Sequence, residues 1–183
     1  MIASIIITSL SKATSMPYKP DLQQNVWITT VDPEDEKDVK KLNRRFAEKG
    51  VKHFSQYFRD WSDEDPEPFI KDRLEIEGPQ ESHVNNIISF LEPLVASDTH
   101  YNLGINCFAG ISRSTAIGII AWVMQGKTVE EALQAVVDVR PVAWPNERML
   151  RFASARLGKN ILTPIIDWKQ EETKKGLLIP HEL

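Results

Sequence analysis

One cysteine, an arginine six residues later and a serine directly after that arginine are the side chains best placed to do chemistry in this chain. They are Cys107, Arg113 and Ser114, and the chain has no other cysteine. An apolar run at 103–105 leads into the cysteine, and an Ala- and Ile-rich run follows the arginine at 114–124. We therefore predict that a short loop here joins the end of a strand to the start of a helix.

A loop of this kind creates a site for an anion. Successive backbone N–H groups can converge on one point, and the helix N-terminus adds positive potential. A thiol in that field ionises more readily than a free cysteine, and a guanidinium presents two donors that match two phosphoryl oxygens. The combination predicts attack of a thiolate on phosphorus. The backbone N–H groups expected to bind the phosphate, together with the Arg113 side chain, belong to Phe108, Ala109, Gly110, Ile111 and Ser112.

The alternative is that these residues are only structural. A free cysteine is commonly a small buried hydrophobic residue, and an arginine at a helix start can be an ordinary surface residue. However, a cation near a helix N-terminus is unfavourable unless an anion compensates it, and this favours the anion site.

The segment resembles the active-site loop of the cysteine-dependent phosphatases, the protein tyrosine and dual-specificity families. Their pattern is His-Cys-x5-Arg-Ser/Thr, and residues 109–115 read Ala-Gly-Ile-Ser-Arg-Ser-Thr, as in small bacterial members. A second match is Arg140-Pro141 followed by Pro145-Asn146. The resemblance covers about residues 102–157. It implies that Cys107 is the nucleophile of a phosphocysteine mechanism, that Arg113 binds the phosphate, and that Ser114 hydrogen-bonds the sulfur.

The resemblance also implies an aspartate on a mobile loop, which protonates the leaving group and then activates water. The segment 59–65 reads Arg-Asp-Trp-Ser-Asp-Glu-Asp and follows a predicted strand. We assign the role to Asp60, which comes immediately after that strand, with Asp63 and Asp65 as the next candidates. The competing interpretation is a solvated acidic loop, which is the usual state of a run of charges.

One residue departs from the pattern, because Asn106 stands where the family has histidine. That histidine takes part in the hydrogen bonds around the loop and helps to keep the thiolate ionised. Asparagine can donate and accept hydrogen bonds, but it cannot become a cation. We expect a lower activity or a shifted pH optimum.

The composition limits the function classes. The net charge of −4 argues against general binding to nucleic acid or to an anionic membrane. A single cysteine excludes an internal disulfide and a cysteine-rich metal site, and it fits a reducing compartment. The four histidines lack ligand spacing, so we assign no metal and no cofactor. The apolar start is too short to span a bilayer and has no basic leader, so we expect a cytoplasmic protein. The oligomeric state stays open.

Strand and helix patterns alternate along the chain. This predicts an α/β fold with a central, mostly parallel sheet flanked by helices, and by resemblance a protein tyrosine phosphatase-like one. We expect one domain over 1–183, with 162–183 as a peripheral tail, and irregular loops at 11–21 and 60–79. The predicted strands are 2–8, 26–30, 51–58 and 103–106. The predicted helices are 36–49, 82–96, 114–124, one that begins at the capping box of Thr128 and Glu131, 146–157 and 165–175.

Three functions remain in competition. The first is a metal-independent phosphomonoesterase, acting on a phosphorylated protein as a tyrosine or dual-specificity phosphatase. In a variant of this hypothesis, the substrate is not a protein but a phosphoinositide, a nucleotide or an RNA 5′-phosphate. The second is a phosphate-binding pseudophosphatase without turnover, and the third is a rhodanese-like sulfur transferase. Ser114 and the Pro145-Asn146 match favour the first.

Overall fold

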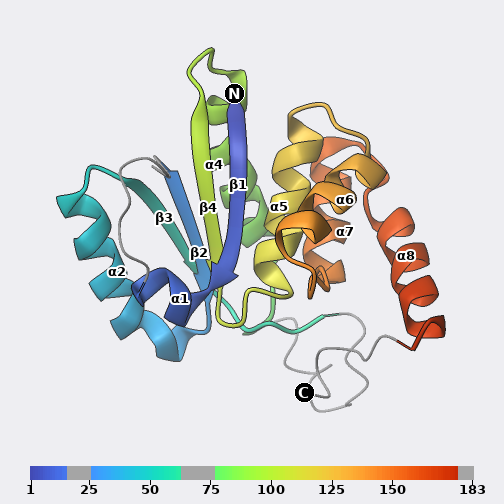
Figure 1. Ribbon diagram of the computed structural model, residues 1–183, viewed down its shortest axis with the longest axis horizontal. Coiled ribbons are helices and arrows are strands. Elements are labelled where there is room, and N and C mark those ends of the chain that lie inside the picture. Colours follow the sequence, from blue (N-terminus) through green and yellow to red (C-terminus); the bar gives the residue numbers. More distant parts are fainter. Residues whose placement is uncertain (16–25, 63–76, 177–183) are drawn as a thin grey trace.

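The computed structural model describes residues 1–15, 26–62 and 77–176 (Figure 1). Within this part of the chain, four strands form one sheet in the order β1-β4-β2-β3, and all neighbouring pairs are parallel. The strands are β1 (Ile2–Ser9), β2 (Val26–Val31), β3 (Lys52–Tyr57) and β4 (Tyr101–Cys107). The prediction of a parallel α/β sheet is confirmed.

Helices cover both faces of the sheet (Figure 1). On one face lie α1 (Leu10–Ser15) and α2 (Glu36–Glu48). On the other lie α4 (Glu81–Ala96), α5 (Arg113–Met124), α6 (Val129–Val139) and α7 (Glu147–Leu157), with α8 (Leu162–Lys174) outside α6 and α7. The 3-10 turn η2 (Pro33–Asp35) leads from β2 into α2. No helix in these described ranges is long and apolar enough to cross a membrane.

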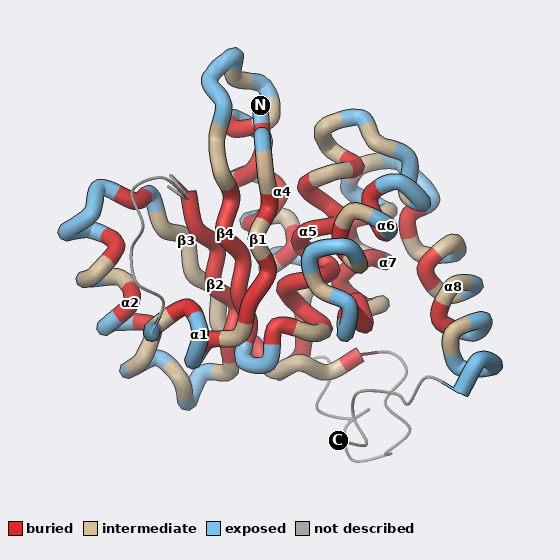
Figure 2. The backbone as a smooth tube through the Cα atoms, viewed as in Figure 1, coloured by how far each residue is buried: buried red, intermediate tan, exposed pale blue. Residues whose placement is uncertain are grey.

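The sheet divides the interior into two cores, which Figure 2 shows as buried residues along the strands and the inner helix faces. Side chains on a strand alternate between faces. Accordingly, Val26 and Ile28 of β2 belong to the larger core under α4 and α5, while Trp27 and Val31 belong to the smaller core under α1 and α2. Every residue of β2 is buried, as expected for a strand covered on both sides.

The helix-end signals in the sequence act as predicted. Thr128 Oγ1 accepts a hydrogen bond from the Glu131 N–H at 3.1 Å, and the Glu131 carboxylate accepts one from the Thr128 N–H at 2.9 Å. This capping box begins α6. The α7 helix begins after Asn146 and ends at Gly158, whose φ of 62° is the left-handed conformation that glycine adopts most readily.

The prediction of a loop over 11–21 is wrong at its start, because α1 occupies Leu10–Ser15. Leu10 and Ala13 are buried one helical turn apart in the smaller core, and this packing stabilises a helix too short to form alone. Residues 16–21, and most of the loop predicted at 60–79, lie outside the described residues.

Three neighbouring strands end at the same edge of the sheet, and each brings a candidate site residue to its end. Asp32 follows β2, Asp60 lies three residues after β3, and Cys107 is the last residue of β4. In open parallel sheets, ligands bind beyond the carboxyl ends of the strands. This edge is therefore where a functional site is expected.

Candidate active site

Cys107 lies at the end of the central strand β4 and is fully buried. Its Sγ accepts a hydrogen bond from the Gly110 N–H at 3.2 Å and lies 3.2 Å from Ser114 Oγ in the first turn of α5. Both groups can donate to the sulfur, as suits a thiolate. The structure thus places Ser114 against Cys107, as the sequence resemblance implied.

The loop between β4 and α5, here called the cysteine loop (residues 107–113), turns its carbonyl groups outward. Four consecutive carbonyl oxygens accept hydrogen bonds from outside the loop. The pairs are Leu10 N to Phe108 O at 3.0 Å, Arg140 Nη2 to Ala109 O at 3.0 Å, Arg140 Nε to Gly110 O at 2.8 Å, and Trp144 N to Ile111 O at 2.9 Å.

This outward pattern determines the direction of the loop N–H groups. The described residues contain no cis peptide bond, and in a trans peptide the C=O and the following N–H point in opposite directions. The N–H groups of residues 109–112 therefore face the other side of the loop, where the Cys107 sulfur lies. The Gly110 N–H bond to Sγ agrees with this geometry. Four such amides and a helix N-terminus form an anion-binding cradle.

Gly110 is the one position of the loop that only glycine fits. Its φ is +76°, and a Cβ there would lie 2.6 Å from the carbonyl carbon of Thr8 on β1. The loop therefore passes closer to β1 than any side chain would allow.

Arg113 begins α5 and is only 1% exposed. Its Nη1 donates to Asp32 Oδ1 at 2.7 Å and to the Phe58 carbonyl at 2.5 Å, while Nε lies 3.4 Å from Asp60 Oδ2. Burial alone would lower the pKa of Arg113, but Asp60, Cys107 and Asp32 raise it overall. The guanidinium therefore stays charged. Its buried Nε has no hydrogen-bond partner among the described residues and only the longer ion pair with Asp60, which a bound anion could replace.

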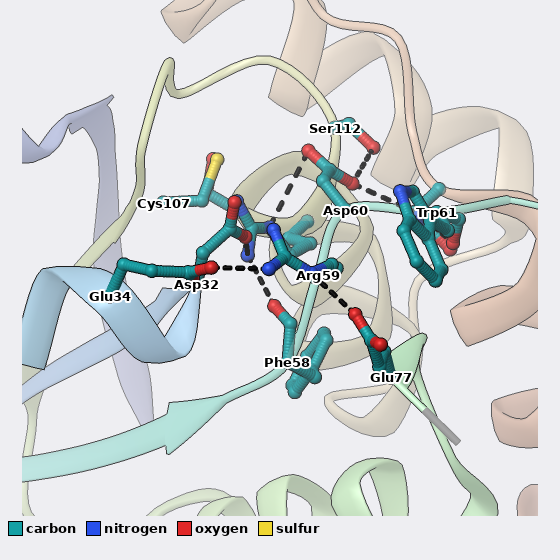
Figure 3. A network of polar contacts seen from close by, with 12 residues as sticks. Asp32, Glu34, Phe58, Arg59, Asp60, Trp61, Glu77, Cys107 and Ser112 are labelled. Carbon is teal, nitrogen blue, oxygen red and sulfur yellow. Dashed lines mark hydrogen bonds and ion pairs between the residues drawn. The ribbon is translucent and has the colours of Figure 1, made fainter. Parts of the chain in front are cut away.

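Asp60 reaches the cysteine loop through its side chain (Figure 3). Its Oδ1 accepts hydrogen bonds from Ser112 Oγ at 2.6 Å and from Asn146 Nδ2 at 3.0 Å. Asn146 also caps α7, because its Oδ1 accepts a hydrogen bond from the Met149 N–H at 3.1 Å. The structure thus brings the predicted carboxylate to the rim of the loop. The other two candidates, Asp63 and Asp65, lie outside the described residues.

Comparisons with known proteins show similarity in fold and, over part of the chain, in sequence. No family model matches the chain. Dual specificity protein phosphatase 15 of mouse is 36% identical over 93 residues, which are 45% of this chain and 38% of the relative, and the rat protein is 34% identical over the same shares. The match thus spans well under half of these relatives. Among solved structures, human DUSP28 has a TM-score of 0.54 at 18% identity, covering 85% of this chain and 91% of that one. PTPMT1 has 0.53 at 14%, covering 92% and 95%.

The chain thus has the fold of tyrosine and dual-specificity phosphatases, and about half of it is similar in sequence to a dual-specificity phosphatase. The active form of Tk-PTP also shares the fold, with a TM-score of 0.52 at 14% identity and coverage of 84% and 90%. Since these structural likenesses are distant, they establish the arrangement of strands and helices. The roles of single residues depend on the contacts in this chain.

Asp32 is a residue of this candidate site that sequence reasoning missed. It accepts a hydrogen bond from Arg113 across 81 residues of sequence. Its position directly after a buried strand is the signal that could have identified it, because the ends of β2 and β4 are neighbours in the sheet. Arg59 is a second missed residue. It pairs with Glu34 and, at 2.7 Å, with Glu77, and so fixes the backbone next to Asp60 (Figure 3).

Asn106, where the family has histidine, is fully buried on the side of the sheet that faces α2. Its Oδ1 accepts hydrogen bonds from Trp27 Nε1 at 2.6 Å and from Thr29 Oγ1 at 2.8 Å, both on β2. Since Trp27 Nε1 can only donate, the oxygen of the Asn106 amide is oriented unambiguously toward β2. The residue before Cys107 is thus held against the neighbouring strand.

Proposed function

We propose that this chain is a metal-independent phosphomonoesterase that hydrolyses phosphorylated protein through a phosphocysteine intermediate. The observation that carries the proposal is the cysteine loop itself, in which four N–H groups face the Cys107 sulfur and a buried, charged Arg113 stands beside them. This set of groups matches the needs of phosphoryl transfer, which depends on positioning and on neutralising charge on the oxygens.

The chemistry would proceed in two displacements. First, the Cys107 thiolate attacks phosphorus, the P–O bond to the leaving group breaks, and Asp60 gives its proton to the departing oxygen. The loop N–H groups and Arg113 hold the three non-bridging oxygens throughout. Then water, deprotonated by Asp60, attacks the phosphocysteine, and the P–S bond breaks. Ser114 donates to the sulfur at 3.2 Å and stabilises the thiolate as it leaves.

Arg113 has to change partners when substrate binds. Without phosphate, its charge is balanced by Asp32 and Asp60. A phosphate group in the cradle competes for the same guanidinium and repels a second anion. Asp60 would thereby lose its ion pair with Arg113 and become free to act on the leaving group as the general acid.

The pseudophosphatase remains the second candidate, since Asn106 replaces the family histidine. A phosphatase of small phosphomonoesters, such as a phosphoinositide or a nucleotide, is the other alternative, because the cradle would bind the phosphate group that all these substrates share. Both alternatives use the same anion cradle. Measurable turnover would rule out the pseudophosphatase. Comparing kcat/KM for phosphopeptides with that for small phosphate esters would separate a protein phosphatase from a phosphatase of small substrates.

The direct test is hydrolysis of p-nitrophenyl phosphate in the presence of EDTA. We expect activity to survive the chelator, because Arg113 and the loop amides neutralise charge that a metal would otherwise neutralise. Vanadate and thiol oxidants should abolish it, and oxidation should stop at a sulfenic acid or sulfenamide, since the chain has no second cysteine. Loss of activity in EDTA that a divalent ion restores would refute the proposal.

Replacing Asp32 with asparagine should lower kcat/KM for an aryl phosphate by about tenfold. Asparagine keeps an acceptor for Arg113 Nη1 but loses the charge that strengthens the hydrogen bond. Asp38→Asn is the matched control, because this exposed carboxylate on α2 pairs with Lys41. Equal activity of the two variants would show that Asp32 does not orient Arg113.

A further inference from the structure

A chain of hydrogen bonds links the residue before the nucleophile to a histidine two strands away. Asn106 Oδ1 accepts from Thr29 Oγ1 at 2.8 Å, and Thr29 Oγ1 lies 2.8 Å from His53 Nε2 on β3. His53 Nδ1 in turn contacts the side-chain amide of Asn43 on α2. We call this set of four side chains the Asn106–His53 relay. It crosses the sheet from β4 through β2 to β3 and ends on a helix.

The number of available hydrogens determines which atom donates and which accepts in each hydrogen bond of the relay. Thr29 has one hydroxyl hydrogen, and Asn106 Oδ1 can only accept it. His53 Nε2 must therefore carry a proton and donate to Thr29. Burial lowers the pKa of His53 to about 4, so the ring is neutral at physiological pH and Nδ1 has no proton. The structure places Asn43 Oδ1 against Nδ1, so this assignment requires the Asn43 amide to rotate by a half turn and present its NH2, which leaves the shape of the side chain unchanged.

Every donor in the relay therefore points toward the oxygen of Asn106. Hydrogen bonds arranged in one direction polarise one another, and each strengthens the next. Trp27 Nε1 adds another donor to the same oxygen at 2.6 Å. This arrangement fixes the rotamer of Asn106, the residue directly before Cys107, and polarises its side-chain amide.

We propose that Thr29 and His53 are positioning residues for the nucleophile and that they act through Asn106. By holding Asn106 in place, the relay fixes the orientation of the end of β4 and so the position of Cys107 at the start of the cysteine loop. The proposal rests on the proposed phosphatase function, but it concerns the reactivity of the thiol, which can be measured without turnover.

Two further features support a specific role for this arrangement. A Cβ at Gly104 would lie 2.1 Å from the Trp27 ring, so the strand carries a glycine where the ring must pass to reach Asn106. In addition, Asn106 Nδ2 is buried and has no hydrogen-bond partner among the described residues. Burying an unpaired donor is unfavourable, yet the position keeps an amide although only its oxygen is used. The amide is therefore poorly explained by packing alone.

The test combines Thr29→Val, His53→Phe and the double variant. Each single change should lower kcat for p-nitrophenyl phosphate by roughly three- to tenfold, the effect of one lost hydrogen bond, with little change in KM. The pH at which iodoacetamide alkylates Cys107 at half its maximal rate should rise in both. The double variant should lose no more than the more damaging single variant, because both changes interrupt one relay.

Thr30→Val is the matched control. Thr30 is the next residue on β2, is equally buried, and has a hydroxyl without a hydrogen-bond partner among the described residues. It should leave kcat and the alkylation profile unchanged. Thr29→Ser keeps the hydroxyl, so its kcat and its alkylation profile should match those of the original protein. Thermal melting of every variant checks the fold.

Additive losses, or an unmoved alkylation profile in both single variants, would overturn the relay. If Thr29→Val fails to fold, Thr29→Ser and His53→Phe decide the question by the same two measurements. Alkylation requires only the thiol. If the original protein hydrolyses no phosphate ester but the Thr29 and His53 variants still shift the alkylation profile, the relay is supported and the proposed phosphatase function is refuted.

Discussion

A Cys107→Ser variant should show no measurable turnover while it binds phosphate or vanadate nearly as well as the original protein. A serine hydroxyl does not ionise at neutral pH and cannot replace the thiolate as nucleophile. The anion cradle is made of other groups, namely the N–H groups of the cysteine loop and the Arg113 guanidinium. These groups remain in the variant, because the contacts that hold the loop carbonyls do not involve the sulfur. Hydrolysis of an aryl phosphate and the affinity for the oxyanion should be measured together.

The comparison variant for this experiment is Ser114→Ala, which keeps the nucleophile and removes its hydroxyl neighbour at 3.2 Å. This variant should still form phosphocysteine but should hydrolyse it slowly, so a burst of product is expected. Substantial turnover by Cys107→Ser would refute covalent catalysis by the thiol. Loss of oxyanion binding in the same variant would instead show that the sulfur helps to hold the loop in shape.

The sequence predicted the parts of the structure that depend on local patterns. The cysteine loop could be located because an apolar strand, a glycine and a helix occur in order within about 20 residues. The capping box at Thr128 and the end of α7 at Gly158 also depend on residues that are close in sequence. Such signals require no knowledge of which strands are neighbours.

The missed features depend on contacts between distant segments. Asp32 acts on Arg113 because β2 lies beside β4 in the sheet, and the order β1-β4-β2-β3 cannot be obtained from periodicity. The same holds for the Asn106–His53 relay, which needs β4, β2 and β3 side by side. The short helix α1 was missed for a related reason, since its stability comes from the packing of Leu10 and Ala13 rather than from helix propensity.

Two residues matched by resemblance have physical roles that the resemblance did not specify. Arg140 donates to the carbonyls of Ala109 and Gly110, and so turns the amides of the loop toward the sulfur. Asn146 both caps α7 and holds Asp60. The segment 140–146 thus supports the anion cradle on one side and the proposed acid on the other. This explains why a segment so far along the chain accompanies the cysteine loop.

Asp60→Asn should lower kcat by roughly 10²- to 10⁴-fold, the usual range for one positioned proton donor. Asparagine has nearly the same shape and can still accept the hydrogen bonds of Ser112 and Asn146, but it cannot deliver a proton. The loss should be greatest with a phenol of high pKa as leaving group and smallest with p-nitrophenol, which departs without protonation. The alkaline limb of the pH–rate profile should flatten, since that limb reports a carboxyl that must be protonated.

The controls for this prediction are Asp63→Asn and Asp65→Asn, made in the same segment. Asp60 is the favoured residue because its two oxygens face Ser112 of the cysteine loop and Arg113. If one of the control variants shows this dependence on the leaving group and Asp60→Asn does not, then the acid lies further along the segment. In that case Asp60 would be a partner of Arg113 in the phosphate-free site, with the same role as Asp32.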